Sequence, residues 1–379
     1  MTDRFERGLI VINHQPFTIN MRILSIETSC DETGAAVLEK ENNQVRVISN
    51  IVASSAELHA ATGGIIPEQA ARLQVQTIIP VIRHALLASE SQKSENTNKD
   101  SVRVKKILEE KIDSIAVTHG PGLIGSLLVG VETAKTLSYV FNKPLVPVHH
   151  LLAHIFANFI SKTEQNPNPS PLPPFPFIGL IVSGGHTDLL YFKSIEQFEW
   201  LGGTRDDAAG EALDKIGRVL NLSYPAGQEI EKLASQVTNP NIQFHSPLIY
   251  EDTFDFSFSG LKTEAMRFVQ KNKLSKEIVN QICFATQRAI IDVLVKKTIA
   301  AAEKYNCKTI VLGGGVSANN ALQNAFRSYI LDHKSYINIF APERKYCTDN
   351  AAMIGSYALM NFKPVEWKKI KAIPELYFT

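Results

Sequence analysis

Two pairs of apolar segments flank short polar turns, one pair in each half of the chain. In the first half, residues 22–27 and 35–39 are rich in apolar residues and enclose the polar turn 28–34. In the second half, residues 177–192 repeat this pattern around a Ser-Gly-Gly-His turn. Short apolar runs that are separated by a few polar or glycine residues are typical of β-hairpins. We therefore expect two hairpins, each with a polar tip.

Segments with helical periodicity alternate with further short apolar runs. Apolar residues that recur every three or four positions predict amphipathic helices. Residues 90–103 are rich in Ser, Asn and Lys and predict a surface loop. We expect strands at 114–118, 144–148 and 309–312, and helices at 70–87, 123–141, 206–220, 277–305 and 349–360. Strands that alternate with helices in both halves predict an α/β fold of two similar lobes.

A proline-rich stretch at residues 166–176 divides the chain, because its prolines favour an extended linker. It separates an expected N-terminal lobe, 21–165, from an expected C-terminal lobe, 177–345. We expect residues 346–379 to form a helix and tail that return to the N-terminal lobe. Residues 1–20 are expected to be a disordered extension.

Composition excludes several protein classes. At 379 residues, with 44% hydrophobic and 20% charged, the chain is ordinary globular material with room for two cores. Its net charge of +1 gives no global field that recruits nucleic acid. Four scattered cysteines without C-x-x-C spacing suit a reducing compartment. No apolar run reaches the roughly 18 residues of a membrane span, and the acidic N-terminus is a poor secretion signal. We expect a cytoplasmic protein with no membrane partner.

The most specific chemical signal is a histidine pair, His150 and His154, four residues apart. On a helix the two imidazoles share a face and can hold one metal ion. The alternative is that they are two satisfied polar residues. A zinc protease of the H-E-x-x-H type needs a Glu directly after the first His, as general base. This chain has Leu151 there, so the pattern indicates a metal clamp without a hydrolytic base.

Two glycine-rich turns are candidate anion sites. In residues 181–187 (IVSGGHT), paired glycines between Ser183 and Thr187 would let backbone N–H groups and hydroxyls approach a phosphate. The alternative is an ordinary hairpin turn. Three glycines at 313–315, between an expected strand and helix, are a second signal of this kind. Neither turn has the G-x-G-x-x-G or Gly-Lys-Ser/Thr pattern, so neither a Rossmann nor a P-loop site is supported.

Acidic residues add further candidates, each with a structural alternative. Residues 206–215 place four acids on one expected helix, where small alanines would direct Glu211 or Asp214 inward; a solvated face is the alternative. Asp31 and Glu32 lie in the first polar turn, where acids are common for reasons of turn geometry. Asp349 could cap the last helix.

In order along the chain, these segments resemble one known family, the universal tRNA threonylcarbamoyladenosine synthase subunit of bacterial or organellar type. This family was formerly called O-sialoglycoprotein endopeptidase. Nine motifs carry the resemblance: IETSCDETG (26–34), GGIIPEQAAR (63–72), GPGLIGSLLVG (120–130), HLLAH (150–154), IVSGGHTDLL (181–190), DDAAGEALDKIGRVL (206–220), FSFSGLKT (256–263), GGGVSANNAL (313–322) and CTDNAAMIG (347–355).

The resemblance implies a two-lobed actin/sugar-kinase-like fold with a central substrate cleft, across which the two hairpin tips face each other. The implied reaction transfers L-threonylcarbamoyl from threonylcarbamoyl-AMP to N6 of adenosine 37 in tRNAs that read ANN codons, forming t6A and AMP. The implied partner is the tRNA anticodon loop. In a bacterium, a non-catalytic paralogue and a small ATPase would be further partners.

Carried over residue by residue, the resemblance implies that His150, His154 and Asp349 bind one divalent metal ion. Fe(II) is the first candidate for this ion and Zn(II) is the second. Asp31 or Glu32, in the facing hairpin, is the candidate proton acceptor. The residues implied to hold the donor are Ile181, Val182, Ser183, Gly184, Gly185, Asp214, Gly227, Glu231 and Asn319.

The chain departs from the family pattern at several positions, none of which removes an implied ligand. Ala226 and Gln228 stand where the family's Tyr-Pro-Gly-Gly-Pro turn has Gly and Pro. Ile181 stands where archaeal and eukaryotic relatives place a metal-contacting Tyr, and Gln74 replaces a usual His.

Three functions compete on the sequence alone: a tRNA carbamoyltransferase, a metalloprotease, and a small-molecule kinase of the same fold. Leu151 counts against the protease, and a kinase should need no His-His-Asp metal site. Two short basic runs, at 103–106 and 368–371, are candidates for the surface that contacts tRNA.

Overall fold

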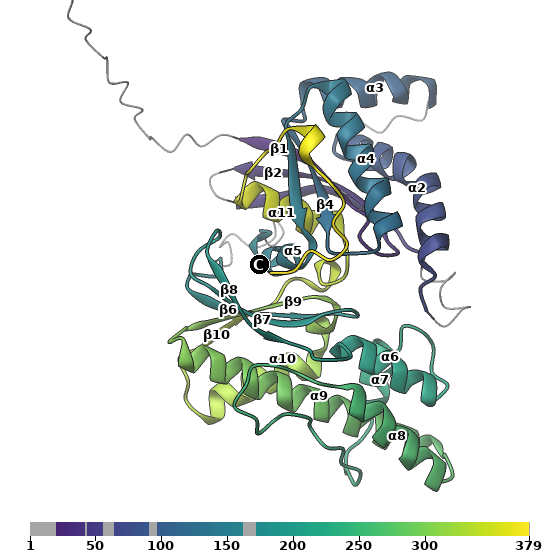
Figure 1. Ribbon diagram of the computed structural model, residues 1–379, viewed down its shortest axis with the longest axis vertical. Coiled ribbons are helices and arrows are strands. Elements are labelled where there is room, and N and C mark those ends of the chain that lie inside the picture. Colours follow the sequence, from purple (N-terminus) through teal and green to yellow (C-terminus); the bar gives the residue numbers. More distant parts are fainter. Residues whose placement is uncertain (1–19, 42–43, 56–63, 91–96, 162–171, 379) are drawn as a thin grey trace, which may run out of the picture.

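The computed structural model describes residues 20–41, 44–55, 64–90, 97–161 and 172–378. They form two α/β lobes, one above the other in Figure 1, and each lobe is built on a five-stranded sheet. The predicted two-lobed α/β fold is thus confirmed. The predicted extension up to residue 19 and the first part of the predicted linker, 166–171, lie outside the described residues.

The sheet of the N-terminal lobe has the strand order β3-β2-β1-β4-β5. Its first three strands are antiparallel, and β4 and β5 then run parallel to β1. Helices cover both faces of this sheet, so its central strands are continuous apolar runs and not alternating ones. The bounds are β1 (Met21–Glu27), β2 (Thr33–Glu41), β3 (Gln44–Ala53), β4 (Ser114–Gly120) and β5 (Leu145–His149).

Neighbouring residues of β1 face two different cores. Leu24 and Ile26 pack with the helices α2 and α4, whereas Ile23 packs with α5 and α11. The helix α11 comes late in the chain, yet it contacts β1 and β2 (yellow in Figure 1). The helices are α2 (Pro67–Ala88), α3 (Thr97–Glu110), α4 (Ile124–Phe141), α5 (His150–Phe156), the 3₁₀ turn η1 (Ala157–Phe159) and α11 (Ala351–Met360), followed by η4 (Trp367–Lys369).

The second sheet repeats the topology of the first, with the order β10-β9-β6-β7-β8. Again three antiparallel strands are followed by two parallel ones. The strands are β6 (Phe177–Val182), β7 (Thr187–Phe192), β8 (Phe198–Gly203), β9 (Thr309–Gly313) and β10 (Asn338–Phe340). The helices are α6 (Ala209–Val219), α7 (Gly227–Ala234), α8 (Ser259–Lys271), α9 (Lys276–Lys304) and α10 (Asn320–Asp332), with 3₁₀ turns η2 (Gly315–Ala318) and η3 (Arg344–Tyr346).

Helix α9 is long and apolar enough, by length and composition, to cross a membrane. However, 67% of its most apolar window is buried inside the C-terminal lobe. Ile282 and Leu294 of this helix are fully buried among residues of the sheet and of α10. The apolar character of α9 is therefore that of a core helix of the C-terminal lobe.

One predicted loop is wrong in part, because helix α3 begins within the segment 90–103. Ile107 and Leu108 of α3 are buried in the core of the N-terminal lobe, and Val104 packs against it. These apolar residues lie beyond the end of the polar segment. That window therefore lacked the apolar residues by which the helix is anchored in the core.

The predicted helix at 206–220 begins only at Ala209, because Asp206 caps a different helix. The Asp206 carboxylate accepts hydrogen bonds from the backbone N–H groups of Phe258 and Ser259, at 2.8 and 3.2 Å. These groups lie at the start of α8, which leaves such donors unpaired within the helix. The four acids therefore do not share one helix.

Candidate functional site

The two histidines are positioned by the junction of β5 and α5. Strand β5 ends at His149, and α5 begins at His150 without an intervening loop. This places His150 and His154 on one face of the helix, with ring centroids 4.8 Å apart. Both side chains are buried, with 6% and 1% of their surface exposed. The shared helical face that the spacing predicted is therefore present.

Asp349 lies just before α11 and does not cap it. The cap is Asn350, whose side chain accepts a hydrogen bond from the Met353 N–H at 3.1 Å. The carboxylate of Asp349 instead lies 3.5 Å from Nε2 of His150 and 3.3 Å from Nε2 of His154. The capping alternative for Asp349 is therefore wrong.

These three side chains could hold a metal ion. Their ligand atoms all lie within 4.8 Å of one another. Both ring nitrogens of His154 are buried without a hydrogen bond to any described residue, since its contact with Asp349 lacks hydrogen-bond geometry. A buried polar atom left unpaired costs about 1–3 kcal/mol, which a bound ligand would offset. Two imidazoles and one carboxylate suit a divalent transition metal.

The charges at this centre support the same interpretation. Burial by itself lowers the pKa of His150, but the carboxylates of Glu27 and Asp349 outweigh it and raise this pKa to about 9. Burial raises the pKa of Asp349, but His150 and His154 hold it well below its usual range. The centre thus strongly favours positive charge between its carboxylates. A metal cation supplies that charge and displaces the proton.

Glu27, at the end of β1, is a functional candidate that the sequence interpretation missed. It is 1% exposed, and its Oε2 lies 3.1 Å from Nδ1 of His150. The same carboxylate accepts hydrogen bonds from the Thr118 hydroxyl and the Ser29 N–H. A carboxylate on the outer nitrogen of a ligating histidine fixes the ring so that its inner nitrogen faces the metal. The signal in the sequence was an acid that ends an otherwise apolar strand.

The tip of the β6–β7 hairpin brings a further imidazole to the centre. Burial and the charges of His150 and His154 lower the pKa of His186 to about 4. His186 is therefore a neutral side chain at neutral pH, close enough to the histidine pair to respond to its charge. Its motif was noted in the sequence, but no role was assigned to it.

The tip of the β1–β2 hairpin holds the predicted proton acceptors. Burial raises the pKa of Glu32 to about 7, the Ser54 hydroxyl opposes this shift, and the charges of Asp31 and Asp349 add to it. One oxygen of Glu32 accepts the Ser54 hydroxyl at 2.8 Å, and the other is buried without a partner among described residues. Gln74 of α2 donates to the Glu32 carbonyl at 2.9 Å and so fixes the tip.

A cavity of about 200 Å³ opens in the C-terminal lobe beside this centre. Thr348 lines it and directly precedes Asp349 in the chain, which joins the cavity to the candidate metal group. Of the nine residues predicted to hold a donor molecule, five line this cavity: Gly184, Asp214, Gly227, Glu231 and Asn319.

Two carboxylates of the cavity are anchored through one oxygen each. Oδ1 of Asp214 accepts the Ala226 N–H at 2.7 Å. Oε1 of Glu231 accepts the backbone and side-chain amides of Asn320, at 2.8 and 3.0 Å. The second oxygen of each makes no hydrogen bond within the described part of the chain. Both residues are thereby held in place while keeping an acceptor for a ligand.

The paired glycines of the β6–β7 turn leave open space. A Cβ added to Gly184 or Gly185 would meet nothing within 4 Å, and neither residue has a positive φ. Neither packing nor backbone conformation therefore demands glycine here. Ile181 and Val182 are fully buried in β6, so only their backbone can contribute.

The expected hydroxyl donors behave differently from one another. Thr187 is fully buried, and its hydroxyl accepts the Ala209 N–H at 2.9 Å, so it stabilises the start of α6. Because Thr187 is fully buried, its hydroxyl is not exposed at the surface of the turn. The Ser183 hydroxyl accepts the His186 N–H at 3.2 Å within the turn itself and keeps its own proton to donate.

Two residues of the triple glycine are needed for packing and backbone conformation, whereas the third, Gly315, lines the cavity. A Cβ on Gly313 would lie 2.7 Å from the His154 carbonyl oxygen, so glycine lets β9 approach the backbone of α5. Gly314 has a φ of +91°, which favours glycine. The Asn319 side chain caps α10 by accepting the Leu322 N–H at 3.1 Å, and it donates to Gln287 at 2.9 Å. Asn319 thus forms a wall of the cavity with its side chain already hydrogen-bonded.

Comparison with known proteins agrees with this geometry. Residues 46–356 match the family described as tRNA N6-adenosine threonylcarbamoyltransferase. Proteins of that name from Moorella thermoacetica and Gloeothece citriformis are 41% and 43% identical to the chain. The first alignment covers 93% of the chain and 96% of the relative, and the second covers 90% and 92%.

Among solved structures, the chain is similar to HypF from T. kodakarensis, with a TM-score of 0.57 and 14% identity over 92% of this chain. It is also similar to full-length HypF in a phosphate- and nucleotide-bound form, with a TM-score of 0.52 and 12% identity over 90% of the chain. The chain spans only 49% and 55% of those two proteins. At such identity the likeness supports the two-lobed fold alone.

Proposed function

The chain belongs to the tRNA N6-adenosine threonylcarbamoyltransferase family and is an enzyme that forms t6A in tRNA; we propose that its active site is the centre and cavity described above. The observation that carries this proposal is the continuity of the two. The His150–His154–Asp349 group adjoins, through Thr348, the cavity that collects the predicted donor-binding residues. The donor is threonylcarbamoyl-AMP, and the acceptor is N6 of adenosine 37 in the anticodon loop of tRNAs that read ANN codons.

The cavity holds the phosphate and ribose of the AMP half of the donor. The phosphate lies on the backbone of Ser183–Gly185, where the absence of a Cβ at Gly184 and Gly185 lets N–H groups approach it. Asp214 and Glu231 accept the ribose hydroxyls with their unpaired oxygens. Gly227 and Asn319 line the walls of the cavity. Ile181 and Val182 are fully buried and contribute through the backbone that leads into the turn.

His150, His154 and Asp349 hold one divalent metal ion, for which Fe(II) is the first candidate and Zn(II) the second. When bound, the ion supplies a Lewis acid for the carbonyl of the threonylcarbamoyl group. Glu27 orients the His150 ring from behind. The nearby His186, neutral at neutral pH, adds no positive charge that would repel the ion.

Glu32 accepts the proton from the adenosine amine, which is a weak nucleophile. A new N6–carbon bond forms, the carbon–oxygen bond to phosphate breaks, and AMP leaves with the electron pair. A base acts best when its pKa lies near the working pH, and the pKa of Glu32 is raised to about 7. The charge of the adjacent Asp31 contributes to this shift, although Asp31 is the alternative acceptor.

We also propose the wider setting of the reaction. The lobes comprise residues 21–165 and 177–345, with 346–379 returning to the first lobe, and the enzyme works in the cytoplasm. Basic residues at 103–106 and 368–371 are candidates for contacts with tRNA phosphates. In a bacterial cell, a non-catalytic paralogue and a small ATPase would assist it.

Mass spectrometry of tRNA nucleosides tests this function. A strain depleted of its own enzyme loses t6A, and this chain should restore it, whereas its His154→Ala variant should not. A peptidase or a small-molecule kinase would leave t6A at the depleted level. Failure of the wild-type chain to restore t6A, when expressed together with the assisting proteins of the host, would contradict the proposal.

A further inference from the structure

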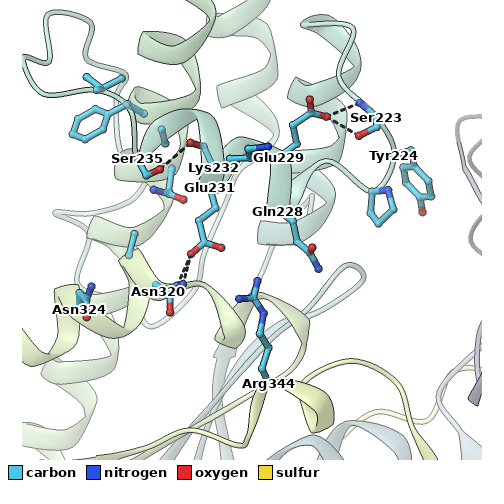
Figure 2. Close-up of a pocket in the computed structure, with 16 residues that line it drawn as sticks. Ser223, Tyr224, Gln228, Glu229, Glu231, Lys232, Ser235, Asn320, Asn324 and Arg344 are labelled. Carbon is cyan, nitrogen blue, oxygen red and sulfur yellow. Dashed lines mark hydrogen bonds between the residues drawn. The ribbon is translucent and has the colours of Figure 1, made fainter. Parts of the chain in front are cut away.

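A second, larger cavity of about 980 Å³ opens next to the donor cavity (Figure 2). The two cavities share Pro225, Gln228 and Glu231 of the α7 region, and Arg344 of η3. These residues therefore form the boundary at which a molecule in the inner cavity meets the outer one.

The inner cavity is too small for a whole nucleotide. Its volume is about 200 Å³, whereas pockets for small molecules and cofactors are typically about 300–1,000 Å³. If Asp214 and Glu231 hold the ribose, as proposed above, the base must project towards the shared boundary. The inference that follows rests on that proposed donor site.

Two side chains at this boundary are free to meet a base. The Gln228 amide and the Arg344 guanidinium make no hydrogen bond or ion pair with any described residue. Figure 2 shows them pointing towards each other, one from α7 and the other from η3. The two carboxylates nearby are anchored, since Glu229 accepts from Ser223 at 2.6 Å and Glu231 accepts from Asn320 through one oxygen.

We propose that Gln228 and Arg344 read the adenine base of the donor. A glutamine amide presents one donor and one acceptor, which match ring N7 and the 6-amino group of adenine. Arg344 stacks its planar guanidinium on the base. Gln228 therefore selects adenine, whereas Arg344 strengthens binding of any purine. Because the family pattern has proline at position 228, with no such amide, this recognition is a property of this chain.

Binding of two nucleotides to the full-length protein tests the proposal by calorimetry. The probes are AMP and purine riboside 5′-monophosphate, which has hydrogen in place of the 6-amino group. Wild-type protein should prefer AMP roughly tenfold. Gln228→Pro should bind the two nucleotides equally, because the preference is a coupling between the amide and the amino group.

Two further variants separate the roles. Arg344→Ala should weaken both nucleotides by a similar factor and keep the preference. Asn324→Ala is the matched control, because Asn324 lines only the outer cavity and should leave both affinities unchanged. A preference for AMP that survives in Gln228→Pro overturns this inference while the donor site stands. Absence of AMP binding to wild-type protein would overturn the donor site itself.

Discussion

At the scale of single residues, the site shows how far local spacing reaches. His150 and His154 are four positions apart, so the helix alone brings their rings together. Asp349 lies almost two hundred positions away, and no periodicity connects it with them. Asp349 was identified as a candidate metal ligand only because its motif resembles that of a known family. Glu27 was missed for the same reason, since its role depends on a contact between two strand ends.

We expect His154→Ala to lower bound iron or zinc to background and to abolish threonylcarbamoyl transfer. The variant removes one of the three donors and leaves two that cannot close the site. Metal content is measured by elemental analysis of purified protein, and transfer by single-turnover formation of t6A. His149→Ala is the control, because this partly buried neighbour is outside the group and should retain the metal. Stoichiometric metal in a His150→Ala, His154→Ala double variant would contradict the assignment.

We expect single-turnover transfer to fall as the pH drops below about 7. Glu32 accepts a proton only when ionised, and burial raises its pKa to about 7, so acid removes the active form. Glu32→Gln should abolish this inflection and slow the reaction about 10²–10⁴-fold. Rates are measured from pH 5.5 to 8.5.

Asp31 provides the matched variant for this test. Its charge helps to raise the pKa of Glu32, so Asp31→Asn should move the inflection to lower pH and keep most of the activity. The reverse result, with Asp31→Asn inactive and Glu32→Gln active, would assign the proton to Asp31 instead.

At the scale of elements, apolar periodicity predicted the strands and most helices, because buried faces repeat regularly. It failed where polar residues determine where a helix begins. Helix α3 begins inside a polar segment, and the apolar residues that anchor it lie beyond the end of that segment. Helix α6 begins later than predicted because Asp206 instead caps the start of α8, which lies about fifty residues further along the chain. Such long-range caps cannot be inferred from a local window.

We expect Gly185→Val to weaken AMP binding at least tenfold while the melting temperature changes by less than about 2 °C. Nothing lies within 4 Å of the position of the added Cβ, so the folded chain accepts the side chain. The valine would nevertheless occupy the space through which backbone N–H groups reach the phosphate. Calorimetry measures affinity, and thermal unfolding measures stability.

A contrasting variant shows that the effect is local. Gly313→Val, also a glycine-to-valine change, should lower stability strongly, because a Cβ there would lie 2.7 Å from the His154 carbonyl oxygen. Equal AMP affinity in wild-type protein and Gly185→Val would mean that the turn is an ordinary hairpin.

At the scale of the whole molecule, function depends on three segments of the chain that come together: the two hairpin tips and the segment with Asp349 before α11. The two sheets have the same topology, so each hairpin tip lies at the corresponding end of its lobe. Helix α11 then packs on the N-terminal sheet and brings Asp349 to α5. The sequence predicted two similar lobes. The return of residues 346–379 was also expected, and the family resemblance implied that the hairpin tips face each other. Periodicity alone does not predict this convergence, because side chains more than a hundred positions apart meet only after both cores have formed.

The convergence also predicts that the protein is not a peptidase. A zinc peptidase of the H-E-x-x-H type needs a general base directly after the first histidine ligand. Here Leu151 occupies that position, and it is fully buried in the apolar core formed with the strands and α11. Leu151→Glu would therefore bury a carboxylate among apolar side chains. It should destabilise the fold by several kcal/mol and impair t6A formation without creating proteolysis.

Leu151→Met, which keeps an apolar side chain of similar volume, should retain both stability and transfer. Incubation with a glycoprotein substrate, followed by mass spectrometry of the products, gives the decisive comparison. Metal-dependent cleavage by purified wild-type protein that is absent from His154→Ala would restore the protease interpretation.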